Sequence, residues 1–190
     1  INNFTWKDWV AEVENAYQEI AANCDTLFVG GESTGGLIAL YLATYRSEIA
    51  GILTYAPALK LTLKPFDLIK LYALAPFIPY IKEEDEDDGL AWRGYLAKPL
   101  KGIIQLLKLQ KATFPLLSEI QAPTLIVQGR LDYTVHPTVP ALIADQIKSD
   151  HVEIYWMEKS THCVALDKEI EDVKQKTHNF IEKVLDKKEA

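Results

Sequence analysis

The chain has 190 residues, of which 48% are hydrophobic and 25% are charged. This is the composition of a single globular domain with a full-sized core, and it excludes a disordered chain, a coiled coil and a collagen-like fibre. The 27 acidic and 20 basic residues give a net charge of −7, which argues against a nucleic-acid-binding protein because phosphates require a basic face. Six of the acidic residues form the continuous run 83–88, so the rest of the chain is close to neutral.

Cysteine usage and hydropathy add further exclusions. The two cysteines, Cys24 and Cys163, lie outside any CxxC pattern or Cys/His cluster, so we expect thiols, no metal ion and no cofactor. A single disulfide between them is the alternative. No apolar run reaches the length of a membrane span and no signal peptide is visible, which leads us to expect a cytoplasmic protein.

The beginning of the chain predicts a helix, a strand and a second helix. Thr5 and Asp8 have the spacing of a capping box, and apolar residues then recur at helical spacing. The short apolar run 26–29, ended by glycines, is typical of a buried parallel strand. Residues 37–45 are apolar on nearly all sides, which predicts a deeply buried helix.

The same alternation continues through the rest of the chain. Strands are predicted at residues 49–56, 124–127 and 152–156, and helices at residues 139–147 and 170–184. Strands that alternate with helices indicate an α/β fold with a mostly parallel sheet flanked by helices.

The segment 59–121 interrupts this alternation. It contains prolines, the acidic run and two helical candidates, at residues 66–74 and 100–111, but no convincing strand. We therefore expect a small helical cap inserted over one end of the sheet, with residues 1–58 and 122–190 forming the core. The acidic run lacks the spaced Asp/Asn–Gly–Glu pattern of a calcium loop, so we expect a solvated loop there.

The sequence Gly31-Glu32-Ser33-Thr34-Gly35-Gly36 matches G-x-S-x-G and lies between a predicted buried strand and a predicted buried helix. This context is typical of a nucleophile elbow, a strand–turn–helix that presents a serine at a helix N-terminus. The turn needs glycine where a Cβ would collide with neighbouring chain, and we expect this at Gly31 and Gly35. Glu32 is expected to make a hydrogen bond within the loop. A structural glycine turn with a capping serine is the alternative.

A serine nucleophile needs a base, and the base needs a carboxylate that orients it. Asp132 follows the predicted strand 124–127, and His162 follows the predicted strand 152–156. The carboxyl ends of parallel strands meet at one edge of the sheet, where Ser33 also lies. The order Ser33, Asp132, His162 is that of α/β-hydrolases, so these three residues are the predicted catalytic triad.

Other residues offer weaker alternatives. His136 lies in the same loop as the aspartate and is the second candidate for the base. His151 and His178 are predicted to be solvated or to lie at the rim of the site. Asp167 is predicted to cap the last helix, and Cys163 to be a small buried residue.

These motifs resemble those of the α/β-hydrolase superfamily, and within it those of small bacterial carboxylesterases and monoacylglycerol lipases. The resemblance covers nearly the whole chain and implies that Ser33, Asp132 and His162 are catalytic and that the insertion 59–121 is a helical cap over the acyl pocket. Besides the elbow, the matching motifs are Tyr95-x-x-x-Pro99, Ala122-Pro123-Thr124, Asp132-x-x-Val135-x-Pro137 and Ser160-x-His162-x-x-x-Leu166-Asp167.

In that family the elbow strand is the fifth of the sheet, and the loop after the third strand carries a His-Gly motif that donates half of the oxyanion hole. No such motif precedes Phe4. Four strands, one helix and their connections amount to about 55 residues, which we expect upstream of this sequence or on another chain. Within this chain the predicted oxyanion donor is the backbone N–H of Thr34.

The sequence therefore predicts a serine hydrolase that cleaves carboxylic esters with a hydrophobic acyl chain, such as acylglycerols, through an acyl-enzyme. The alternatives are a thioesterase, amidase or acyltransferase with the same triad, and a non-catalytic ligand-binding protein on a hydrolase fold. Apolar residues of the predicted cap are expected to form the acyl pocket or its lid. They are Leu61, Leu63, Phe66, Leu68, Leu71, Tyr72, Leu74, Phe77 and Ile78.

Overall fold

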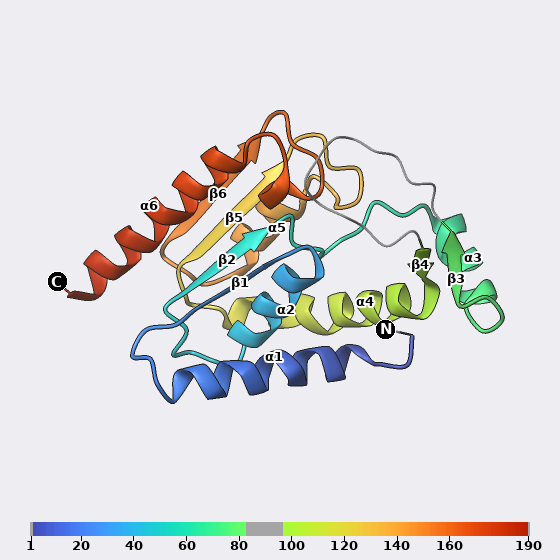
Figure 1. Ribbon diagram of the computed structural model, residues 1–190, viewed down its shortest axis with the longest axis horizontal. Helices are drawn as coiled ribbons and strands as arrows, with labels where there is room; N and C mark the ends of the chain where they lie inside the picture. Colours follow the sequence, from blue (N-terminus) through green and yellow to red (C-terminus); the bar gives the residue numbers. More distant parts are fainter. Residues whose placement is uncertain (1, 83–96, 190) are drawn as a thin grey trace.

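A computed structural model describes residues 2–82 and 97–189. Its centre is a four-stranded parallel sheet with the strand order β1-β2-β5-β6 (Figure 1). The strands are β1 (Phe28–Glu32), β2 (Gly51–Tyr55), β5 (Thr124–Gly129) and β6 (Val152–Met157). Because all four run in the same direction, their carboxyl ends meet at one edge, as the alternation of strands and helices predicted.

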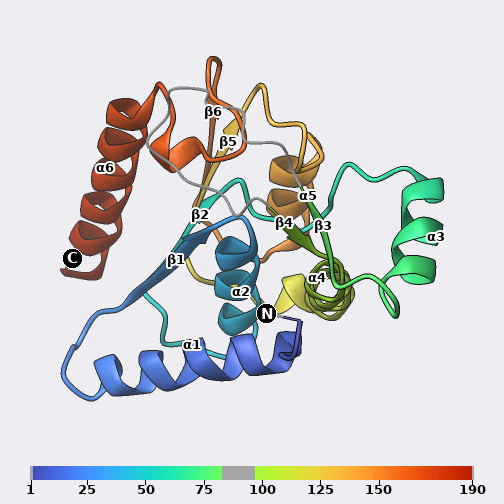
Figure 2. The ribbon, with the colours of Figure 1, turned by 45° about the vertical axis from the view of Figure 1, so that its right-hand side comes forward.

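Helices cover both faces of the sheet (Figures 1 and 2). On one face lie α1 (Trp6–Ala21), α2 (Thr34–Ala43) and α5 (Val139–Gln146), which share a core cluster with the sheet residue Ile126. The long helix α6 (Ile170–Glu189) covers the other face. This two-sided cover explains why every residue of β5 is buried.

The predicted helix boundaries are close to those observed. The capping box of Thr5 and Asp8 is present at the start of α1. Seven of the ten residues of α2 are buried, which agrees with a helix that is apolar on nearly all sides. The strand β1 lies two to three residues later than predicted and runs through Gly30 and Gly31, because both glycines pair with residues of β2.

The insertion is more ordered than predicted. It contains α3 (Pro65–Leu74), α4 (Leu100–Thr113) and the 3-10 helix η1 (Phe114–Glu119), together with the antiparallel pair β3 (Tyr80–Lys82) and β4 (Ala97–Pro99). The expectation that it holds no strand is wrong, because segments of three residues are too short to show a period of their own. The acidic run 83–88 and Tyr95 lie outside the described residues.

The second half of the insertion packs against the core helices. The side chains of Leu109, Leu117 and Ile120 are fully buried in the same cluster as Leu37 of α2. In contrast, much of α3 is exposed, and Phe66 and Phe77 are 63% and 85% accessible. The insertion therefore consists of an outer part around α3 and an inner part that belongs to the main core.

Strand β1 is the edge of the sheet at the side where further strands were expected. Within residues 2–82 and 97–189, no strand pairs with its outer side. A groove of about 230 Å³ runs along this edge between α1 and α2 and is lined by Tyr17, Val29, Gly30 and Gly35, among others. None of the helices in this part of the chain is both long enough and apolar enough to cross a membrane.

Candidate active site

Ser33 occupies the sharp turn between β1 and α2. Its backbone has φ 54° and ψ −114°. A positive φ is strained for a residue that carries a side chain. Such strain is typical of a nucleophile elbow, where it turns the serine hydroxyl away from the helix and toward the edge of the sheet. The backbone therefore supports the nucleophile elbow over a plain glycine turn.

The glycines of the elbow contribute differently from the prediction. A Cβ on Gly31 would lie 2.6 Å from the backbone carbon of Gly35, so the first expected collision is confirmed. A Cβ on Gly35 would have no described atom within 4 Å, because this residue faces the groove along the open edge of β1. The second tight position is Gly36 instead, where a Cβ would lie 2.8 Å from the Gly31 carbonyl oxygen.

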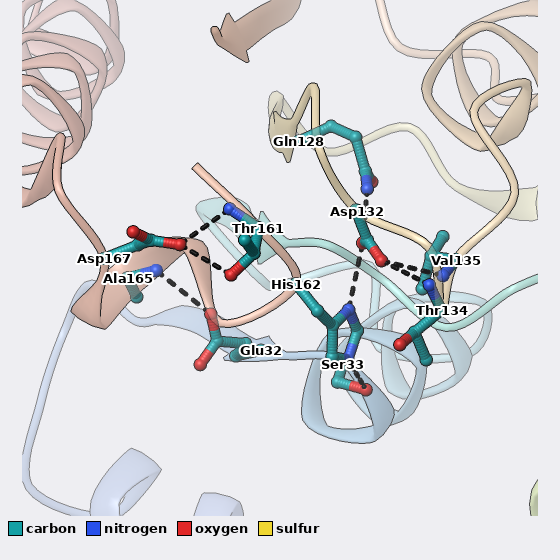
Figure 3. A network of polar contacts seen from close by, with 10 residues as sticks. All are labelled: Glu32, Ser33, Gln128, Asp132, Thr134, Val135, Thr161, His162, Ala165 and Asp167. Carbon is teal, nitrogen blue, oxygen red and sulfur yellow. Dashed lines mark hydrogen bonds and ion pairs between the residues drawn. The ribbon is translucent and has the colours of Figure 1, made fainter. Parts of the chain in front are cut away.

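The three residues predicted to form the triad come together at the carboxyl edge of the sheet (Figure 3). His162 Nε2 lies 2.9 Å from Ser33 Oγ, and His162 Nδ1 lies 2.9 Å from Asp132 Oδ2. The imidazole thus bridges the hydroxyl and the carboxylate through its two nitrogens. This arrangement can take a proton from the serine while the carboxylate holds the ring in the required tautomer.

The carboxylate of Asp132 is held from several sides. Its side chain is 1% exposed, and Oδ1 accepts the N–H groups of Thr134 and Val135 at 2.7 and 3.0 Å. Oδ2 accepts from Gln128 Nε2 at 2.6 Å as well as from His162. Burial acts to raise the pKa of Asp132, but the bond and charge of His162 and the two N–H groups lower it below its ordinary value. The group is therefore a carboxylate at neutral pH.

Three further carboxylates bind the loop that carries His162. Asp167 Oδ2 accepts the N–H and the hydroxyl of Thr161, each at 2.6 Å, and Glu169 Oε2 accepts the N–H of Lys159 at 2.7 Å. Glu32 Oε1 accepts the N–H of Ala165 at 3.0 Å, which confirms its predicted hydrogen-bonding role (Figure 3). The prediction that Asp167 caps the last helix is wrong. Helix α6 begins three residues later, and the carboxylate of Asp167 is already bound to the loop.

The alternative histidines lie elsewhere. His136 Nδ1 is 2.8 Å from the hydroxyl of Thr138, in the loop before α5. His151 Nε2 is 2.9 Å from Glu153, and His178 is an exposed residue of α6. His136 is therefore not the partner of the serine. Cys163, next to the triad histidine, is half-buried and forms no disulfide with the exposed Cys24.

Two residues that sequence reasoning did not single out support the site. Gln128, at the end of β5, is fully buried and donates to Asp132. Gly129 follows it, and a Cβ there would lie 2.1 Å from the carbonyl oxygen of Thr161. The backbones of the aspartate loop and the histidine loop approach each other so closely that only glycine fits. In the sequence, both residues could have been recognised as a polar residue and a glycine at the end of a predicted buried strand.

An apolar cavity opens beside the elbow. It has a volume of about 320 Å³ and lies between α1, α2 and α4. Its lining residues are Trp9, Thr34, Ile38, Pro99, Gly102, Ile103 and Leu106. Six of the nine residues expected to form the acyl pocket or its lid are exposed and do not line this cavity, namely Leu63, Phe66, Tyr72, Leu74, Phe77 and Ile78. In the described ranges, no group of three His, Cys, Asp or Glu side chains is placed to hold a metal ion.

Two curated proteins are similar to this chain in sequence. The chain is 30% identical over 163 residues to a thermostable monoacylglycerol lipase from Bacillus sp. (strain H-257), and the match covers 86% of this chain and 65% of that protein. It is 24% identical over 185 residues to a carboxylesterase of Bacillus subtilis (strain 168), covering 94% of this chain and 73% of that protein. The chain therefore spans about two thirds to three quarters of the length of these relatives.

Solved structures give the same result. A structure from work on LipS and LipT, two metagenome-derived lipolytic enzymes, superposes with a TM-score of 0.85 at 30% identity, over 96% of this chain and 75% of that one. The Paleococcus ferrophilus monoacylglycerol lipase superposes with a TM-score of 0.75 at 16% identity, over 94% of this chain and 76% of that one, which is evidence for the fold. The sequence profile of the prolyl oligopeptidase family matches residues 2–188. The chain therefore belongs to the prolyl oligopeptidase family and has the α/β-hydrolase fold.

Proposed function

We propose that this chain carries the catalytic triad of a serine hydrolase that cleaves carboxylic esters through an acyl-enzyme. The observation that carries the proposal is the continuous line of hydrogen bonds from Ser33 Oγ through both nitrogens of His162 to Asp132, with each step 2.9 Å long. A binding protein has no need of all three groups in this order, so the geometry favours catalysis over a non-catalytic function.

In the first half of the reaction, Ser33 Oγ attacks the ester carbonyl carbon while His162 Nε2 takes the hydroxyl proton. Asp132 stabilises the resulting imidazolium. The negative charge on the carbonyl oxygen is stabilised by the backbone N–H of Thr34, at the start of α2, because the first N–H groups of a helix have no partner within it. The C–O bond then breaks, and the alcohol leaves with the proton from His162.

In the second half, a water molecule replaces the alcohol. His162 Nε2 takes a proton from the water as it attacks the acyl carbon bound to Ser33 Oγ. The tetrahedral intermediate collapses, the proton returns to Ser33, and the carboxylic acid is released. The chain thus uses one histidine as base and acid in turn, with no group consumed.

The cavity beside Thr34 supports a hydrophobic acyl chain. It adjoins the oxyanion donor, its remaining lining is apolar, and its volume of about 320 Å³ is at the lower end of ligand pockets. The relatives named monoacylglycerol lipase and carboxylesterase support an ester over other leaving groups. A substrate with a medium-length acyl chain, such as a monoacylglycerol, fits these observations.

The experiment is hydrolysis of p-nitrophenyl esters from C2 to C16 by the purified protein, with Ser33→Ala as the control variant. We expect turnover that the variant abolishes, with butanoate or octanoate preferred over acetate. A preference for acetate would overturn the acyl-pocket assignment but not the triad. A proline-containing peptide p-nitroanilide is tested in parallel, because the family takes its name from an oligopeptidase. Turnover of this peptide but of no ester would show that the substrate is an amide.

A further inference from the structure

We propose that Glu32 is a positioning residue that sets the orientation of His162 relative to Ser33, an inference that rests on the proposed hydrolase function. Glu32 is the last residue of β1 and directly precedes the nucleophile. Its Oε1 accepts the N–H of Ala165, which lies three residues after His162 (Figure 3). One side chain thus connects the strand that carries Ser33 to the loop that carries His162.

The connection forms a closed ring. Ser33 is bonded directly to Glu32, and the Glu32 carboxylate accepts a 3.0 Å hydrogen bond from the Ala165 N–H. From Ala165 the backbone leads to His162. The ring closes through the 2.9 Å contact between His162 Nε2 and Ser33 Oγ. A change in the Glu32–Ala165 distance must therefore shift the base relative to the nucleophile or strain the loop. Both ends of this hydrogen bond, at Glu32 and at Ala165, are half-buried.

The other carboxylates on this loop act at a different place. Asp167 and Glu169 bind the segment before the histidine, through Thr161 and Lys159, and belong to the region where α6 begins. They fix the loop to α6. Glu32 fixes the segment after the histidine to the nucleophile strand, which makes it the more direct determinant of the Ser33–His162 distance.

The charges around Glu32 support a second contribution. The pKa of Glu32 is raised, mainly by burial and further by the negative charges of Asp132 and Asp167. The hydrogen bond from the Ala165 N–H and the charge of His162 act to lower it. The same carboxylate acts on Tyr55 of β2. Burial raises the pKa of the Tyr55 phenol, and the negative charge of Glu32 raises it further. Among the described groups, then, Glu32 adds to Asp132 in stabilising a positive charge on His162.

Two substitutions separate the hydrogen bond from the charge. Glu32→Ala removes both, whereas Glu32→Gln keeps an oxygen that can accept the Ala165 N–H and removes only the charge. Glu158→Gln is the control for loss of a carboxylate near this loop, because the exposed Glu158 pairs with Arg130 at 2.9 Å and not with the segment after His162. All three are assayed on the p-nitrophenyl ester that the wild type hydrolyses fastest.

We expect Glu32→Ala to lower kcat by roughly 10- to 100-fold, as for misplacement of a reacting group by up to about 1 Å, with little change in KM. Glu32→Gln should recover most of kcat. Glu158→Gln should match the wild type in kcat and KM.

Two further measurements separate this proposal from stability and from the proposed function. A carboxyl with a raised pKa destabilises the folded state once pH exceeds that pKa, so Glu32→Gln should have an equal or higher Tm at pH 8. The rate at which a fluorophosphonate labels Ser33 should fall in Glu32→Ala, recover in Glu32→Gln and stay unchanged in Glu158→Gln, whether or not an ester is hydrolysed. Wild-type kcat and a wild-type labelling rate in Glu32→Ala would overturn the proposal, whereas an inactive wild type would overturn the hydrolase function.

Discussion

Gln128 donates a hydrogen bond of 2.6 Å to Oδ2 of Asp132, the same oxygen that lies 2.9 Å from His162 Nδ1. The glutamine is completely buried at the end of β5, and its Oε1 has no partner among the described residues. An incompletely satisfied buried amide costs stability. Its place beside the aspartate indicates that it orients the carboxylate.

Replacement of Gln128 by leucine therefore separates function from stability. The variant removes the donor to Asp132 and also removes the unpartnered oxygen, so Tm should change little. We expect kcat/KM to fall about tenfold, equivalent to about 1.4 kcal/mol, because the carboxylate is held less firmly against His162. Hydrolysis kinetics and thermal unfolding of the same preparation check this. Unchanged kcat/KM would show that the two N–H groups of Thr134 and Val135 are sufficient.

The second prediction concerns the close approach at Gly129. A Cβ there would lie 2.1 Å from the Thr161 carbonyl oxygen and 2.6 Å from that of Ser160, and both are backbone atoms that cannot move independently of the histidine loop. We expect Gly129→Ala to displace His162 and to lower kcat about 100-fold, with a lower Tm. A variant with the wild-type kcat would contradict the proposed tight coupling of the two loops.

The third prediction tests the cavity beside Thr34. Leu106 lines it and is half-buried on α4. Leu106→Trp should fill the space and lower the ratio of octanoate to acetate hydrolysis about tenfold, whereas Leu106→Ala should keep or raise that ratio, since each buried methylene contributes about 0.8 kcal/mol. The two variants control for each other. Equal effects on both esters would place the acyl chain elsewhere.

The fourth prediction concerns the attachment of α6 to the sheet. Glu153 of β6 accepts from Lys183 at 2.8 Å, from Tyr155 at 2.6 Å and from His151 at 2.9 Å. Burial acts to raise the pKa of Glu153, but these three hydrogen bonds and the charge of Lys183 lower it to about 2. The ionised group therefore contributes stability above its ordinary pKa, and the contribution is lost as pH falls toward 2.

Accordingly, Glu153→Gln should lower the stability at pH 7 by roughly 1–2 kcal/mol, or about 2–8 °C in Tm. The difference from the wild type should shrink as pH falls from 4.5 toward 2, because first the unfolded and then the folded wild type takes up a proton at Glu153. Thermal unfolding followed by circular dichroism at several pH values checks this. A constant difference across the series would show that shape rather than charge holds α6 in place.

Sequence patterns were sufficient to predict the three residues of the candidate triad. Ser33 lies in a motif with a characteristic strand–turn–helix context, and the two partners follow buried strands whose ends a parallel sheet brings to one edge. The prediction needs only the direction of the strands and the order of the motifs. It needs no knowledge of side-chain packing.

The supporting contacts could not be predicted in the same way. The hydrogen bond between Glu32 and Ala165 joins residues 133 positions apart. The need for glycine at position 129 arises from the backbone of Ser160 and Thr161, which belong to a different loop. No local period or propensity reports such contacts. The pair β3–β4 and the apolar cavity depend likewise on how the insertion folds back onto α1 and α2.

The most direct test of the central claim is reaction of the protein with a fluorophosphonate, followed by mass spectrometry of the intact chain and its peptides. A serine activated by His162 should displace fluoride and carry one phosphonyl adduct at Ser33. We expect this adduct in the wild type, none in Ser33→Ala, and a strongly reduced rate in His162→Ala. Absence of the adduct in a folded wild-type sample, or equal labelling of the His162→Ala variant, would contradict the account.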